Sequence, residues 1–125
     1  MFGFRRANNN YAAPTTKQVA ANTAVTYSVG DALVVTEGKL ALAGSTVTPE
    51  YVAAQGGLGL DTLSVYQIEK NQEYETTLTG SGTLVVGSKV TMANAKEVTT
   101  VTTNGVAEVV SAAGTASGSA VVVRF

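Results

Sequence analysis

The chain has 125 residues, the size of one domain, and carries a net charge of −1 with only 14% charged residues. A near-neutral chain lacks the basic surface that binds nucleic acid or an anionic membrane, so we expect neither as a partner. The chain contains neither cysteine nor histidine, which excludes disulfides, thiolate chemistry and the Ser-His and Cys-His nucleophile pairs. The low charge density is instead typical of a surface that binds another protein.

The first sixteen residues show no periodicity and mix aromatic residues with two arginines, an asparagine run and a proline. We predict a flexible N-terminal arm over residues 1–16, disordered alone and ordered against a partner, before a single β domain over 17–125. An ordinary frayed terminus is the alternative. Deletion of residues 1–11 is expected to leave folding intact. The candidate contact residues of the arm are Phe2, Phe4, Arg5, Arg6 and Tyr11.

The next segments carry strand and turn signals. Residues 25–29 alternate apolar and polar side chains, which is the period of a half-buried strand. Residues 33–35 and 39–42 flank Glu37-Gly38, where glycine allows the positive φ of a tight turn, so we predict a hairpin. Between the arm and these strands, residues 16–24 are the only segment in which a short helix fits.

Short strands continue to the C-terminus. We predict them over residues 51–55, 63–68, 74–78, 84–86, 90–92 and 121–125. The segment 63–68 is apolar on both faces in places, which is typical of a central strand. Asn104-Gly105 predicts a hairpin that joins residues 98–103 to 106–110. This spacing of strands and turns predicts an all-β fold, a small β-barrel or sandwich of short antiparallel strands with an extended N-terminal arm.

The sequence contains no convincing catalytic or metal-binding pattern. Glu73 and Glu75 lie about 7 Å apart on one strand face, within the range of glycosidase carboxylates, but a solvated sheet face is the favoured interpretation. Asp31 and Asp61 are isolated and form no calcium loop. Residues 82–89 resemble a phosphate loop with Ser88 and Lys89 in the wrong order. We therefore expect no enzyme, no catalytic residue, no metal and no cofactor.

The order of several segments resembles the head decoration, or cement, proteins of tailed bacteriophages. The resemblance covers residue 30 to the C-terminus and lies in GDALVVTEGKLALA (30–43), TPEYVAAQ (48–55), VYQIEKNQEYETTL (65–78), LVVGSKVTM (84–92), GVAEVV (105–110) and GTASGSAVVVRF (114–125). The arm lies outside it.

The resemblance implies a β-tulip-like fold and a structural virion protein that is made in the host cytoplasm. Such a protein docks on the outer capsid surface, commonly as a homotrimer, and cements the lattice of the major capsid protein. Many weak contacts repeated by icosahedral symmetry suit that role, because avidity replaces a single strong site. The alternative function is a host- or glycan-binding β module of a phage tail or cell-surface protein.

Overall fold

The computed structural model describes residues 1–7 and 14–125. Within these residues the fold consists of ten strands in two antiparallel sheets of five, without a helix. Sheet A has the order β1 (Gly3–Ala7), β7 (Gln72–Thr77), β10 (Ala120–Arg124), β9 (Ala107–Ala112), β8 (Lys89–Val90). Sheet B has the order β2 (Lys17–Ala20), β6 (Thr62–Gln67), β5 (Tyr51–Ala53), β3 (Ala32–Thr36), β4 (Lys39–Leu42).

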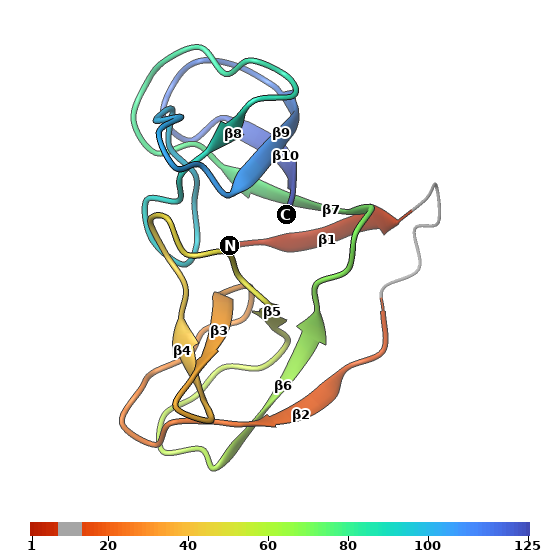
Figure 1. The fold of residues 1–125 in the computed structure, drawn as a ribbon, viewed down its shortest axis with the longest axis vertical. Coiled ribbons are helices and arrows are strands. Elements are labelled where there is room, and N and C mark those ends of the chain that lie inside the picture. The colour runs from red at the N-terminus through yellow and green to blue at the C-terminus, as the bar shows by residue number, and fades with distance from the viewer. Residues whose placement is uncertain (8–13) are drawn as a thin grey trace.

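The two sheets occupy the two halves of an elongated molecule, with sheet A above and sheet B below in Figure 1. The prediction of an all-β fold of short antiparallel strands is confirmed. Neither sheet closes on itself, so the sandwich-like alternative fits and the barrel does not. In the part of the chain that the structure describes, no helix is long and apolar enough to cross a membrane.

The hairpin predicted at Glu37-Gly38 is confirmed. β3 and β4 pair in antiparallel register from Leu33 opposite Leu42 to Thr36 opposite Lys39. Glu37 and Gly38 have φ angles of 52° and 77°, and two consecutive positive values make the two-residue turn that matches the twist of the strands. The turn of this hairpin was predictable because its signal lies within two adjacent residues.

Three other predicted segments differ from expectation. Residues 25–29 do not form a strand; Tyr27 makes an isolated bridge to Gly57 and its hydroxyl donates to the Leu40 carbonyl at 2.7 Å. Residues 84–86 form a loop, and residues 98–103 do so too except for a bridge at Val98. A turn lies at Thr103-Asn104, one residue before the predicted Asn104-Gly105, and the Gly105 amide closes it by donating to the Thr102 carbonyl at 3.2 Å. The strand that follows, β9, pairs with β8 and β10 instead of with residues 98–103. The segment 16–24 contains strand β2 where a helix was allowed.

The expectation that residues 1–16 lack regular structure is wrong at Gly3–Ala7. This segment is β1, an edge strand of sheet A that pairs antiparallel with β7. Phe2 is 1% exposed and its ring meets that of Phe125 edge to face, with centroids 5.5 Å apart. Burial of an aromatic ring offsets the entropy of ordering the segment, which is why the strand docks on its own chain. Tyr11 lies outside the described residues.

The core consists of two clusters, separated by sheet B. The larger cluster lies against sheet A and includes Tyr74, Val109 and Val123, with Ala32 and Val52 contributed from sheet B. The smaller cluster lies on the other face of sheet B and includes Leu33 and Leu63. Alternation along β3 sends Ala32 to one cluster and Leu33 to the other, so this part of sheet B is buried on both faces.

Candidate functional site

A β-bulge in β1 brings two adjacent arginines to one carboxylate. Phe4 is paired with Tyr74 and Arg6 with Glu73, so Arg5 is an extra residue between them. In a regular strand Arg5 and Arg6 would point to opposite faces, but a bulge places two residues across from one. Arg6 Nε donates to Glu73 Oε2 at 2.8 Å, and Arg5 Nη1 lies 3.6 Å from Glu73 Oε1. The arginine pair therefore fastens β1 to β7.

The two carboxylates of the candidate catalytic pair, Glu73 and Glu75, differ in environment. Glu75 is exposed, whereas Glu73 is buried and held by the arginines of β1. The prediction that both belong to a solvated sheet face is therefore wrong for Glu73. Its charge is balanced by Arg5 and Arg6, as buried charges require. The geometry assigns Glu73 to the attachment of β1.

Glu73 belongs to a row of alternating charges across sheet A. Arg6 pairs with Glu73 on β7, and Glu108 on β9 pairs with both Arg124 on β10 and Lys89 on β8. Val123 pairs with Tyr74, so the same register continued by one residue places Arg124 across from Glu73. The row reads positive, negative, positive, negative, positive over five strands. Opposite charges on neighbouring strands stabilise this register.

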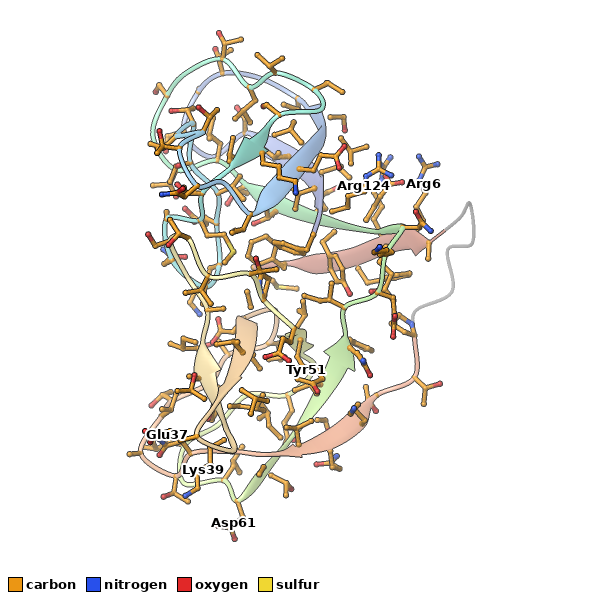
Figure 2. The ribbon with its side chains drawn as sticks, in the orientation of Figure 1. Arg6, Glu37, Lys39, Tyr51, Asp61 and Arg124 are labelled. Atoms are coloured by element: carbon orange, nitrogen blue, oxygen red, sulfur yellow. The ribbon has the colours of Figure 1, made fainter. Side chains whose placement is uncertain are left out.

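The charge row lies on the face of sheet A that points away from the core. The neighbours of its members along the strands, among them Tyr74, Val90, Ala107 and Val123, are buried in the larger cluster. Because side chains alternate along a strand, the charged members point the other way. Figure 2 shows Arg6 and Arg124 on the same flank of the molecule. Arg124 Nε lies 3.8 Å from Glu108 Oε2.

The end of sheet A carries exposed apolar side chains on neighbouring loops. Val85 and Val86 are 64% and 67% exposed on the loop before β8, and Val101 is 53% exposed on the loop before β9. The two loops touch, because a side chain at Gly82 would meet Thr100. In Figure 1 the loop before β8 lies at the upper end of the molecule, and the loop before β9 runs along the side of the same half. We call Val85, Val86 and Val101 the loop valines.

A polar groove lies on sheet B, over β2 and β6. Its volume is about 840 Å³, and it is open to solvent. The side chains that line it are mainly amides and hydroxyls, with one carboxylate and one phenol, and they include Gln18, Gln55, Asp61, Ser64 and Tyr66. Gln18 Nε2 donates to Ser64 Oγ across the two strands. Amide, hydroxyl and phenol groups of this kind can hydrogen-bond the polar groups of a ligand.

Asp31 is the other buried carboxylate, and its role is structural. It accepts from the Ser28 amide at 2.8 Å and from Lys96 Nζ at 2.6 Å. Lys96 in turn lies in the loop after β8, so the pair ties the start of sheet B to the sheet A half. Among the described residues, no three acidic, histidine or cysteine side chains come together as metal ligands would.

The predicted contact residues thus have separate positions. Phe2 is buried, and Phe4 is half-buried against Tyr74, with ring centroids 6.0 Å apart. Arg5 is exposed at the bulge while still near Glu73. Sequence reasoning missed the charge row and the groove, because their members come from strands that are distant along the chain. For Val85 and Val86 the sequence did hold a signal, because residues 84–86 are an apolar run between two glycines.

Comparison with protein-family models, with curated proteins and with solved structures found no match to this chain. The interpretation of its surfaces therefore depends on the residues and the geometry described above.

Proposed function

We propose that the chain is a structural virion protein that binds the outer surface of a phage capsid and cements the lattice of the major capsid protein. The observation that carries the proposal is the position of the loop valines. Three large apolar side chains are exposed on two touching loops in the sheet A half of the molecule. Large exposed apolar side chains on neighbouring loops are typical of a surface that another protein covers.

The charge of the molecule and the resemblance in segment order support the same function. The resemblance to head decoration proteins runs from residue 30 to the C-terminus and includes residues 84–92, which hold two of the loop valines. A low charge density keeps the penalty for desolvating a docking surface small. Each site then needs only weak binding, since the capsid repeats it many times and a homotrimer multiplies the contacts.

Binding to undecorated capsids tests the proposal. Capsids of the phage that encodes the chain are mixed with the purified protein, and saturable cosedimentation is expected. The variant Val85→Ser/Val86→Ser should bind at least about 30-fold more weakly, because each exposed valine loses about 1 kcal/mol or more of apolar burial. Leu58→Ser is the matched control, since Leu58 is 63% exposed on a loop of sheet B. Failure of the unchanged protein to saturate capsids would refute the function.

The polar groove of sheet B favours a second candidate, a host- or glycan-binding module. Tyr66 offers a partly exposed ring beside Gln18, Gln55 and Asp61, and a sugar uses both a ring to stack on and polar groups that bind its hydroxyls. A glycan array probed with the isolated protein tests it. Binding that is lost in Tyr66→Ala and kept in Tyr51→Ala supports this candidate, and a blank array removes it.

A further inference from the structure

A small pocket beside the charge row has an excess of cations. It has a volume of about 370 Å³ and is lined by Lys70, Asn71, Lys89, Glu108, Arg124 and Phe125. Among these lining side chains there are three cations and one carboxylate. The net charge of the lining is still positive when the α-carboxylate of Phe125 is counted with Glu108. On a chain with a net charge of −1, a local excess of cations is unusual.

One residue that lines the pocket has a hydrogen-bond donor without an acceptor. Arg124 Nε is buried and has no hydrogen-bond partner among the described residues. Its nearest carboxylate oxygen, on Glu108, is 3.8 Å away, beyond hydrogen-bonding distance.

The walls of the pocket come from four segments. Lys70 and Asn71 belong to the turn before β7, and Asn71 has a φ of 69° that bends the chain there. Lys89 and Glu108 pair across β8 and β9, and Arg124 ends β10. Both lysines are exposed, so they are free to approach a ligand.

The mixed lining indicates which kind of anion fits. Glu108 repels a ligand with dense negative charge, such as a nucleic-acid backbone or a phosphate dianion, and so disfavours both. A single carboxylate can contact Arg124 and the two lysines, which together supply the cationic groups of the lining. This combination of groups suits an aspartate or glutamate side chain on a protein segment.

We propose that this pocket binds a carboxylate side chain on an acidic segment of the partner protein. The partner is the major capsid protein, and this identification rests on the proposed function. The pocket lies at the charge row and the loop valines lie on the loops at the end of sheet A. The two surfaces give apolar attachment and charge-specific orientation as separate contributions.

Titration with a hexaglutamate peptide tests the pocket in the absence of a capsid. In ¹⁵N-labelled protein at low salt, we expect amide shifts centred on Lys70, Lys89, Glu108 and Arg124, which fade as salt is raised. Lys70→Glu/Lys89→Glu should weaken the binding about tenfold. Lys39→Glu is the matched control, because Lys39 lies at the far end of the molecule in Figure 2 and should leave the affinity unchanged.

Several outcomes would overturn the pocket. Shifts spread over the whole surface, equal affinity for hexaglutamine, or tighter binding of an oligothymidylate or of inorganic phosphate would each do so. So would a double variant that keeps both its spectrum and its hexaglutamate affinity. Capsid binding separates the two proposals. If capsids bind the unchanged protein and the double variant equally, the pocket proposal is refuted and the proposed capsid-binding function is retained. If the protein binds hexaglutamate but not capsids, the pocket is supported as a carboxylate site and the proposed capsid-binding function is refuted.

Discussion

Replacement of Phe2 by alanine measures whether the N-terminal strand belongs to the folded domain. Phe2 is 1% exposed in the larger core cluster, and its ring contacts that of Phe125. Truncation of a buried phenylalanine costs about 3–5 kcal/mol of unfolding free energy. A terminal edge strand can detach to limit this cost, but detachment also breaks the pairing with β7 and the Arg6–Glu73 hydrogen bond. We therefore expect a loss of about 3 kcal/mol.

Urea unfolding followed by far-UV circular dichroism provides the measurement. The midpoint should fall without a change in the slope, and for a domain of this size a loss of about 3 kcal/mol lowers Tm by roughly 10–15 °C. Val86→Ala is the control, since this exposed side chain should change stability by no more than about 0.5 kcal/mol. A loss below about 1 kcal/mol in Phe2→Ala would show that β1 is dispensable, as the interpretation of a free arm requires.

Three further predictions concern buried groups. Burial raises the pKa of the Tyr74 phenol above the ordinary tyrosine value of about 10. The folded protein therefore keeps this phenol protonated at a pH where the unfolded chain ionises it, so the free energy of unfolding is constant below about pH 10 and falls above it. Urea midpoints at pH 8 and pH 11 should drop less in Tyr74→Phe than in the unchanged protein, and equal drops would contradict this. Lys96→Met should cost more, about 2–3 kcal/mol, than Asp31→Asn at about 1–2 kcal/mol. The reason is that the side chain of Asp31 is 2% exposed and that of Lys96 is 47% exposed, so only the carboxylate is left buried and unpaired; urea unfolding that gives the reverse order would refute it. Gly105→Ala should lower stability by at least about 2 kcal/mol in thermal unfolding, because its Cβ would lie 2.2 Å from a main-chain carbonyl oxygen at the start of β8, whereas Gly3→Ala, whose Cβ meets nothing nearer than 3.9 Å, should be near neutral.

Local sequence determined the elements whose signals act within a few residues. Glu37 and Gly38 both have positive φ angles, and this turn preference does not depend on the rest of the fold. The turn and its flanking strands were therefore predictable. The apolar patterns of residues 63–68 and 121–125 likewise predicted β6 and β10. At Asn104-Gly105 the same reasoning placed the turn one residue too late and missed the strand partner. A turn is a local preference, whereas the partner of β9 is chosen by which neighbours bury its apolar face.

For the candidate sites, the sequence named Arg5 and Arg6 but not what they contact. Their carboxylate, Glu73, is distant along the chain, and only the bulge in β1 brings both arginines to it. The pocket could not be predicted either, because its cations come from the turn before β7 and from β8 and β10, which are brought together only by the pairing of sheet A. Residue types, turns and the absence of histidine and cysteine were fixed by the sequence itself. The docking of β1, the charge row and the position of the loop valines were decided by the tertiary structure, because each depends on non-local strand pairing and on burial of apolar surface that no short segment can achieve alone.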